Sequence, residues 1–322
     1  MTMQPKCLIV QPIHSDGLAL LAAAGITPVL APAPDTATTI GLIPDCAAVI
    51  TRDAGLSGAA IRASDELRVV VVHGTGHDAV DKVTASQRGV LVCNTPGVNA
   101  RSVAELALGL ALSAARLIPA ADRAEREGTP GFRESARFTE LSGKTVLIVG
   151  WGAIGSALGA MLRDGLGMRV LVYSPRAAVP EGFHKVDLAD GLARADLISL
   201  HAPLTEATRG LLGLEAFRAM KPGMLVVNTA RAGLIDEAAL ADAIASGRIA
   251  AAALDVYEDG APLGPLGASG RVIFTPHLGA TTEDALARVA VAAARTVIAA
   301  LGGKRPATAV NEPTIRQTGS TL

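Results

Sequence analysis

A glycine-rich segment near the middle of the chain has the spacing of a phosphate-binding loop. The apolar run 146–149 leads directly into a Gly-x-Gly-x-x-Gly pattern, and a helical stretch follows it. Gly150 permits a tight turn, Gly152 lets the backbone approach a pyrophosphate, and Gly155 lets the helix pack close to the strand. The free N–H groups at the helix start favour an anion. The predicted pyrophosphate contacts are Gly150, Gly152, Ala153, Ile154 and Gly155.

The next strand ends without the acid that usually selects the cofactor. A carboxylate about 20 residues past the glycines ordinarily binds the ribose 2′-hydroxyl of NAD. Here Val170–Tyr173 is followed by Ser174, Pro175 and Arg176, with no Asp or Glu at the strand end. Ser174 can hydrogen-bond a 2′-phosphate and Arg176 can pair with it, while no carboxylate repels it. These residues favour NADP. The alternative is a solvent-facing Arg176 beside a site that accepts NAD.

Further motifs follow in a fixed order along the chain. They are Asn94–Gly97 (NTPG), Asn99–Glu105 (NARSVAE), His201–Thr205 (HAPLT), Asn228–Arg231 (NTAR), Ala253–Tyr257 (ALDVY) and Thr275–Gly279 (TPHLG). Together with the glycine loop they resemble the D-isomer-specific 2-hydroxyacid dehydrogenases, the family of phosphoglycerate dehydrogenase and glyoxylate/hydroxypyruvate reductase. The resemblance covers nearly the whole chain, and the motifs are specific as a set and not singly.

The resemblance implies an α/β fold of two doubly wound parallel-sheet domains, with a Rossmann cofactor domain inserted in a flavodoxin-like substrate domain. We expect residues 1–98 and 284–322 to form the substrate domain. Residues 99–283 are then the dinucleotide-binding domain. The implied activity is reversible, NAD(P)-dependent reduction of a small 2-oxo acid to a 2-hydroxy acid.

By the same resemblance, Arg231 binds the substrate's carboxylate and carbonyl, and His277 acts as acid or base. A planar guanidinium can bind both groups in fork geometry. Hydride arriving at the carbonyl carbon leaves an alkoxide that must be protonated near neutral pH, which suits His. Both residues follow apolar strands, Met224–Val227 and Val272–Thr275. We therefore expect both at the carboxyl ends of strands, where open α/β sheets bind ligands.

The chain departs from the family at the Glu that orients the catalytic His. In the family this Glu lies five residues beyond the Asp of the ALDVY-type motif, and counting from Asp255 that position is Gly260. One alternative is that a loop one residue longer brings Glu258 or Asp259 to His277. The other is that His277 lacks a carboxylate partner, so its charged form is less favoured.

The family motifs carry the remaining expected contacts. Those with the cofactor are His201, Pro203, Thr208, Thr229, Ala230, Arg231, Asp255, His277 and Gly279. Those with the substrate are Asn99, Arg52, and Gly74, Thr75 and Gly76, whose backbone N–H groups would hold a carboxylate. For the glycine segment, a plain strand–helix turn is the alternative interpretation.

The elements that must position these residues alternate along the chain. Short apolar runs between Ala-rich stretches predict parallel sheets covered by helices. Strands are expected at 7–11, 28–30, 47–51, 69–73 and 90–94, and six more at 146–149, 169–173, 197–200, 225–228, 251–255 and 272–275. Helices are expected at 15–24, 101–116 and 283–301. The segment 122–141 is expected to be solvated or at an interface, and the tail after Pro306 to be poorly ordered.

Length and composition argue against several other classes of protein. The 322 residues, of which 50% are hydrophobic and 2% aromatic, fit two domains. The net charge of −1 leaves no surplus of basic residues to bind nucleic acid. No apolar run reaches the roughly 18 residues of a membrane span. Cys7, Cys46 and Cys93 form no CxxC pair, which argues against a zinc site and a disulfide framework. We expect a cytoplasmic protein without metal, and a homodimer through helix 101–116 and the arm after it.

The same fold also allows a function of another class. A nicotinamide-sensing, corepressor-like binding protein is favoured by the missing Glu and disfavoured by the retained Arg231 and His277. The shortage of aromatic residues favours a small polar substrate.

Overall fold

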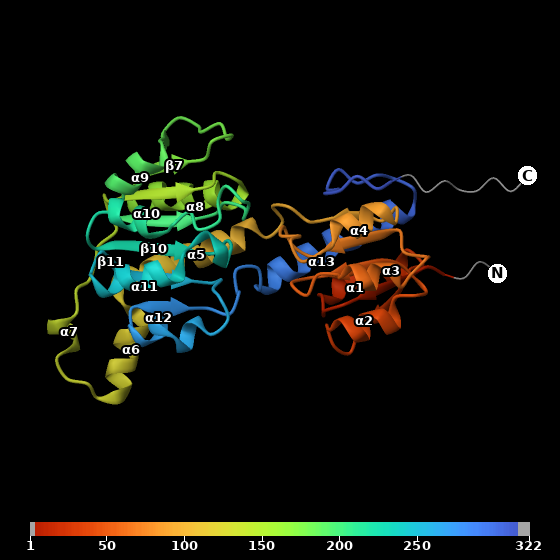
Figure 1. Ribbon diagram of the computed structural model, residues 1–322, viewed down its shortest axis with the longest axis horizontal. Coiled ribbons are helices and arrows are strands. Elements are labelled where there is room, and N and C mark those ends of the chain that lie inside the picture. Colours follow the sequence, from red (N-terminus) through yellow and green to blue (C-terminus); the bar gives the residue numbers. More distant parts are fainter. Residues whose placement is uncertain (1–3, 315–322) are drawn as a thin grey trace, which may run out of the picture. The chain divides into compact units, whose positions relative to one another are not determined.

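The computed structural model describes residues 4–314, which form two compact α/β units (Figure 1). Unit 1 contains the described residues up to Asn99 and those from Ala280 onward, and unit 2 spans Ala100–Gly279. The chain therefore leaves unit 1, builds unit 2 without interruption, and returns. The division predicted from the sequence places the crossings after residues 98 and 283.

Unit 1 is built on a five-stranded parallel sheet of order β2-β1-β3-β4-β5. The strands are β1 (Lys6–Ile9), β2 (Thr27–Leu30), β3 (Cys46–Thr51), β4 (Val69–Val72) and β5 (Leu91–Cys93). One face packs on α1 (Ser15–Ala23) and α13 (Glu283–Leu301), and the other on α2 (Thr36–Leu42), α3 (Gly58–Arg62) and α4 (Lys82–Gln87). This is the doubly wound, flavodoxin-like order, and it confirms the expected fold class.

The return of the chain through α13 completes the core of unit 1. Ala293, Ala294 and Val297 of this helix are fully buried against the sheet. Gly17 lets α1 lie directly on α13, because a Cβ at this position would come within 2.8 Å of Ala290 Cβ. The core of unit 1 contains no Phe, Tyr or Trp, since all of these residues lie in unit 2.

Unit 2 is built on a seven-stranded parallel sheet of order β12-β11-β10-β9-β6-β7-β8. The strands are β6 (Thr145–Val149), β7 (Arg169–Tyr173), β8 (His184–Lys185), β9 (Leu197–Leu200), β10 (Met224–Asn228), β11 (Ile249–Leu254) and β12 (Val272–Phe274). Counted within the unit, β8 to β11 give the order 3-2-1-4-5-6 of a dinucleotide-binding fold, and β12 is added at the edge. The expected Rossmann domain is therefore confirmed.

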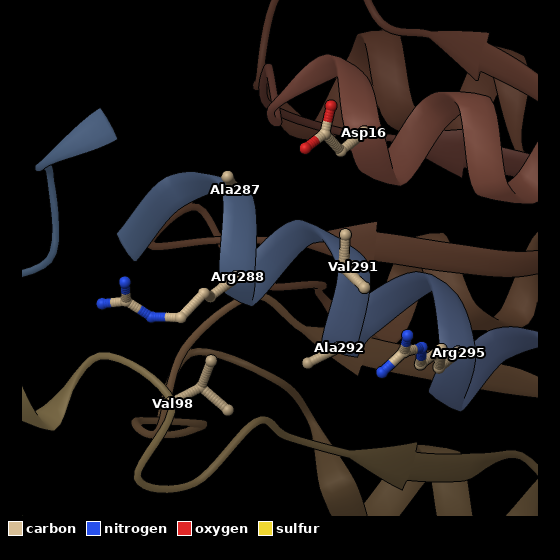
Figure 2. A pocket seen from close by; sticks show the side chains of 7 residues that line it. All are labelled: Asp16, Val98, Ala287, Arg288, Val291, Ala292 and Arg295. Carbon is tan, nitrogen blue, oxygen red and sulfur yellow. The ribbon is translucent and has the colours of Figure 1, made fainter. Parts of the chain in front are cut away.

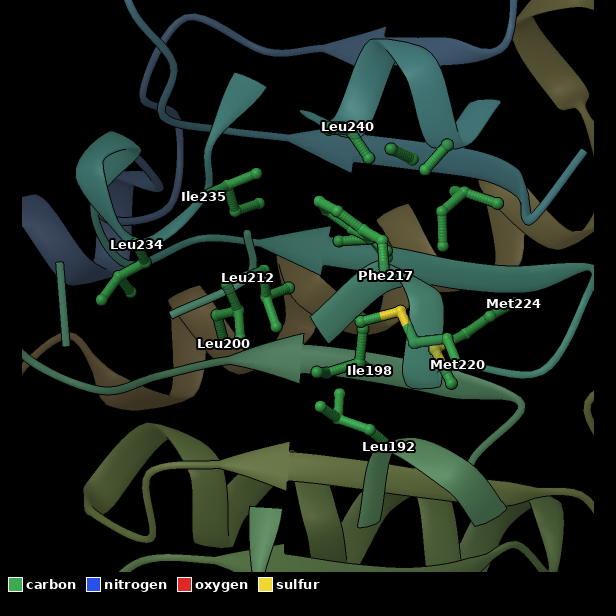
Figure 3. Packing of buried hydrophobic residues seen from close by; sticks show 14 of the residues in the cluster. Leu192, Ile198, Leu200, Leu212, Phe217, Met220, Met224, Leu234, Ile235 and Leu240 are labelled. Carbon is green, nitrogen blue, oxygen red and sulfur yellow. The ribbon is translucent and has the colours of Figure 1, made fainter. Parts of the chain in front are cut away.

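Helices cover both faces of this sheet. One face packs on α5 (Ala100–Arg116) and α8 (Ala153–Leu166). The other packs on α9 (Leu188–Arg194), α10 (Leu214–Ala219), α11 (Glu237–Ala245) and α12 (Pro265–Ala268), with the short turns η1 (Ala232–Leu234) and η2 (Ala261–Leu263) between them. Phe217 of α10 is buried in this second core beside Leu212 and Met220 (Figure 3).

Three features differ from the sequence-based expectations. The edge strand β8 was not predicted, because both of its residues are polar and exposed. The segment 122–141, expected to be solvated or at an interface, is mostly exposed, but it contains most of α6 (Ile118–Glu127) and all of α7 (Phe132–Ser135), two helices that were not predicted. The prediction of a poorly ordered tail after Pro306 is wrong for residues up to 314, because Ala309 forms an antiparallel bridge with Cys93 and the Asn311 side chain accepts a hydrogen bond from Val92 N at 2.8 Å. Residues 315–322 lie outside the described residues.

No single helix among the described residues has the length and hydropathy to cross a bilayer. Taken together, α5 and α6 meet those requirements, but they are bent by 55° relative to each other. The three cysteines are free and fully buried, as expected for thiols that pack as small apolar groups.

Candidate functional site

The glycine loop lies where the strand order of unit 2 reverses, because Gly150 follows β6 and His201 follows the neighbouring β9. Gly150 has a φ of +96°, and a Cβ there would come within 2.6 Å of the His201 carbonyl group. A Cβ on Gly155 would come within 2.1 Å of the Gly150 oxygen. A Cβ on Gly152 would meet nothing within 4 Å. The outer glycines are thus required by the chain's own packing, while Gly152 leaves open space at the start of α8 that fits a pyrophosphate.

Trp151, the chain's single tryptophan, stands inside this loop. Its ring packs against Phe183 with centroids 4.7 Å apart, and a Cβ on Gly159 would come within 2.7 Å of it. The indole is therefore fixed on α8 beside the predicted pyrophosphate position. Its fluorescence can report both cofactor binding and the unfolding of unit 2.

The end of β7 carries the residues expected to select the cofactor. Ser174 is half-buried, and Pro175 and Arg176 are exposed. Lys185, on the adjacent strand β8, donates from Nζ to the carbonyl oxygens of Pro175 at 3.1 Å and Ala177 at 3.0 Å. Lys185 was not predicted as a site residue, because its position eleven residues after Ser174 gives no local sign that it returns to this loop.

His201 is held neutral beside the glycine loop. Its Nε2 lies 2.9 Å from Ser199 Oγ, while Nδ1 is enclosed without a hydrogen-bond partner among the described residues. Burial lowers the pKa of the ring to about 4. In the following loop, Thr208 Oγ1 donates to Pro203 O at 2.7 Å and accepts from Thr205 N at 2.8 Å. The two predicted loop residues Pro203 and Thr208 therefore hold this loop closed.

The buried His201 predicts a pH-dependent stability of unit 2. In the unfolded chain the ring has a pKa of 6.5 and is protonated below that pH. In the folded protein it stays neutral until the pH falls to about 4. The free energy of unfolding should therefore fall as the pH drops through this range, by on the order of 3 kcal/mol from this group. We expect His201→Asn to show a correspondingly shallower loss between pH 7 and pH 4 in urea unfolding followed by Trp151 fluorescence. Parallel losses in both proteins would contradict this assignment.

The residues predicted for the chemistry follow three adjacent parallel strands. Arg231 comes shortly after β10, Asp255 directly after β11, and His277 shortly after β12. The backbone links these strand ends, since Asp255 N donates to Asn228 O at 2.9 Å and His277 N donates to Asp255 O at 3.1 Å. Arg231, Asp255 and His277 are thus brought to one edge of the same sheet that carries the glycine loop.

Asp255 fixes the turn that carries His277. Its carboxylate, 1% exposed, accepts hydrogen bonds from Thr275 Oγ1 at 2.6 Å, Leu278 N at 2.7 Å and Gly279 N at 2.9 Å. These bonds hold His277 at a left-handed φ of +56°, which is uncommon for a residue other than glycine, while leaving it exposed. The buried carboxylate therefore acts on the position of the imidazole through the backbone.

A buried amide shapes the loop that carries Arg231. Asn228 Nδ2 donates to Arg231 O at 2.8 Å, and its Oδ1 accepts from Ala230 N at 3.0 Å. Between them, Thr229 Oγ1 is enclosed without a hydrogen-bond partner among the described residues. The roles of Asn228 and Thr275 were not predicted from the sequence. The available signal was a polar residue that ends an otherwise apolar strand.

The predicted substrate loop of unit 1 follows β4. Gly74 N donates to Thr95 Oγ1 at 2.8 Å, so this N–H is already engaged. Asn94 Nδ2 donates to Thr75 O at 2.8 Å and orients the next peptide. Of the three predicted N–H donors, only those of Thr75 and Gly76 are without an acceptor among the described residues. The prediction of a carboxylate site therefore rests on these two.

Arg52 lies at the switch point of the unit 1 sheet, after β3. Its N–H donates to Gln11 Oε1 at 3.1 Å and its Nη1 to Pro12 O at 3.2 Å. Burial, and secondarily the charge of Arg52, lowers the pKa of His73 to about 4. His73 Nε2 is enclosed without a partner among the described residues, and so is Oδ1 of Asn99, the remaining predicted substrate contact in this unit.

Known proteins resemble this chain in sequence and in fold. The family model for the NAD-binding domain of D-isomer-specific 2-hydroxyacid dehydrogenases matches residues 108–279. The chain belongs to this family. It is 43% identical to a D-3-phosphoglycerate dehydrogenase of Mycobacterium bovis over 86% of this chain and 53% of that protein. The chain thus spans about half the length of that relative.

Two further relatives have nearly the same length as this dehydrogenase-family chain. A hydroxypyruvate reductase of Thermotoga maritima is 38% identical over 81% of this chain and 87% of its own. A Thermus thermophilus protein of solved structure superimposes with a TM-score of 0.87 at 30% identity, covering 95% of this chain and 99% of its own. The family resemblance inferred from the motifs is confirmed.

The loop where the family carries its Glu has a conformation of its own. Gly260 directly precedes η2 and has a φ of +87°, a backbone angle that disfavours a side chain. Glu258 N donates to Glu237 Oε1 at 2.8 Å, and burial together with the Glu258 charge raises the pKa of Glu237. Among the described residues there is no hydrogen bond or ion pair between His277 and Glu258 or Asp259. That Glu258 or Asp259 takes the place of the family Glu beside His277 stays a prediction.

Unit 1 also contains a cavity that the predicted site residues do not line. This cavity of about 390 Å³ is lined by Asp16, Val98 and the α13 face from Ala287 to Arg295 (Figure 2). None of the predicted cofactor or substrate residues lines it. Within residues 4–314 there is no group of three or more His, Cys, Asp or Glu side chains placed to hold a metal ion.

Proposed function

We propose that the protein is an NADP-preferring D-2-hydroxyacid dehydrogenase that works mainly as a reductase of a small polar 2-oxo acid. One observation carries the proposal. Arg231 and His277 stand at the carboxyl edge of the sheet that also carries the glycine loop, and the buried Asp255 and Asn228 hold the turns around them. Membership of the dehydrogenase family supports the same activity.

Each residue type suits one part of this chemistry. The Arg231 guanidinium would bind the carboxylate and carbonyl oxygens of the 2-oxo acid and orient its carbonyl carbon. A nicotinamide cofactor whose pyrophosphate is held at the glycine loop would supply the hydride. His277 would donate a proton to the oxygen of the former carbonyl and take one back in the oxidation direction. The Thr229 hydroxyl, which is enclosed without a hydrogen-bond partner among the described residues, would hydrogen-bond the cofactor.

The activity is tested with a panel of 2-oxo acids. Oxidation of NADPH and of NADH is followed by absorbance with glyoxylate, hydroxypyruvate and larger 2-oxo acids in parallel. We expect turnover with small polar members, faster with NADPH. No turnover with any 2-oxo acid, by a protein that quenches Trp151 fluorescence on binding NADPH, would refute the proposed activity.

The cofactor preference is tested at the end of β7. Arg176→Gln removes the guanidinium expected to pair with the 2′-phosphate, so the Kd for NADPH should rise by roughly tenfold or more. The Kd for NADH should stay within about twofold, because it lacks that phosphate. Equal weakening of both cofactors, measured by Trp151 quenching, would show that Arg176 does not read the phosphate.

We also propose a homodimer formed through the arm after α5. Nine residues of α5 are already buried inside unit 2, but Ile118 at the start of α6 is 52% exposed and Phe138 is 41% exposed. Sedimentation should show a dimer at micromolar concentration, and Phe138→Ser should shift it toward monomer. A monomeric wild-type protein would contradict this. The cytoplasmic location expected from the sequence stays a prediction.

A further inference from the structure

We infer that Lys185, on the edge strand β8, is a second cation of the 2′-phosphate site and contributes directly to the choice of NADP over NAD. This inference rests on the NADP preference within the proposed function. β8 pairs with β7 in parallel, and Lys185 stands opposite Val172. The loop Ser174–Ala177 follows β7, so the lysine stem extends from the neighbouring strand toward the loop that carries Arg176.

The hydrogen bonds of Lys185 place its charge within this loop. Its ammonium donates to the carbonyls of Pro175 at 3.1 Å and Ala177 at 3.0 Å, the two residues that flank Arg176. An ammonium has three N–H donors. Two are used by these carbonyls, and the third has no partner among the described residues. The third donor is available to a ligand that lies against the loop.

The charges around the loop favour a phosphate. Residues 174–180 include Arg176 and no acid. Neither Arg176 nor Lys185 forms an ion pair with a described acidic side chain. Two such cations beside the half-buried Ser174 hydroxyl would accommodate the doubly charged 2′-phosphate and would gain nothing from the 2′-hydroxyl of NAD. Lys185 would therefore act both by fixing the Arg176 loop and by its own charge.

The test compares two fragments that differ only in the 2′-phosphate, adenosine 2′,5′-bisphosphate and 5′-AMP. Titration calorimetry is used on the full chain, so no turnover is needed. Lys185→Gln should raise the Kd for the bisphosphate by roughly tenfold, in line with the loss of a charge-assisted hydrogen bond. The Kd for 5′-AMP should change by less than about twofold. Lys185→Arg should keep most of the affinity. Arg169→Gln, an exposed cation at the opposite end of β7, is the matched control and should change neither.

The double variant separates the two effects of Lys185. Adding Lys185→Gln to Arg176→Gln should raise the Kd for the bisphosphate further if the Lys185 ammonium binds the phosphate itself. No further loss, or an equal loss of both fragments, would overturn the inference. If the wild-type protein binds 5′-AMP as tightly as the bisphosphate, the NADP preference itself fails. If the wild-type protein prefers the bisphosphate but Lys185→Gln binds it as tightly as the wild type does, the NADP preference stands and only the role of Lys185 is refuted.

Discussion

Replacing His277 by Asn is expected to lower kcat by about 10²- to 10⁴-fold, the usual contribution of a general acid or base. Asn tolerates the left-handed backbone that His277 adopts at a φ of +56°, so the turn should persist. The hydrogen bonds from Thr275, Leu278 and Gly279 to Asp255 do not involve the imidazole and should also remain. The loss is therefore expected in the chemical step.

The measurement is steady-state reduction of the best 2-oxo acid from the panel. Binding of NADPH, followed by Trp151 fluorescence, serves as the control: its Kd should change far less than kcat in His277→Asn, because His277 is only one of many predicted cofactor contacts. A variant that keeps more than about a tenth of the wild-type kcat would show that another group moves the proton. The same assay applied to Glu258→Gln and Asp259→Asn tests the replacement of the family Glu. If neither variant changes the pH–rate profile, neither acid assists His277.

Asp255→Ala is expected to lower the free energy of unfolding of unit 2 by about 3 kcal/mol. The carboxylate accepts three hydrogen bonds at a position that is 1% exposed, and each abandoned buried donor has a cost. Two of these donors are backbone N–H groups that cannot turn elsewhere. The turn at His277 should loosen at the same time, so kcat should fall together with stability.

Two variants make the Asp255 prediction specific. Thr275→Val removes only one of the three bonds and should cost about 1 kcal/mol. Asp259→Ala removes an exposed acid from the same loop region and should be close to neutral. Urea unfolding followed by Trp151 fluorescence measures all three. A loss below about 1 kcal/mol in Asp255→Ala would mean that water replaces the carboxylate, and that the turn is held by other contacts.

The regular elements were predictable because buried parallel strands and long helices repeat one simple pattern. Arg169–Tyr173, Leu197–Leu200 and Glu283–Leu301 have the bounds expected from the sequence. The exceptions are elements without an apolar signal. His184–Lys185 is too short and polar to stand out, and half of the residues of α6 are charged.

The site was predictable where short spacing determines it and unpredictable where distant residues meet. The glycine loop is readable because three glycines within six residues each have a local reason. The bond from Thr275 to Asp255 joins residues 20 apart, and the bond from Gly74 N to Thr95 joins residues 21 apart. Such pairs follow from strand order, which a sequence alone does not specify. The same limit concealed Lys185, whose partners lie across a loop.

The absence of aromatic rings from unit 1 makes that half of the molecule transparent in near-ultraviolet spectroscopy. Every Phe, Tyr and Trp belongs to unit 2, so near-ultraviolet dichroism and intrinsic fluorescence come from unit 2 alone. Far-ultraviolet dichroism sums both units. An unfolding transition seen in the far ultraviolet and missing from the fluorescence is therefore that of unit 1, and the two stabilities can be separated without a label or a mutation.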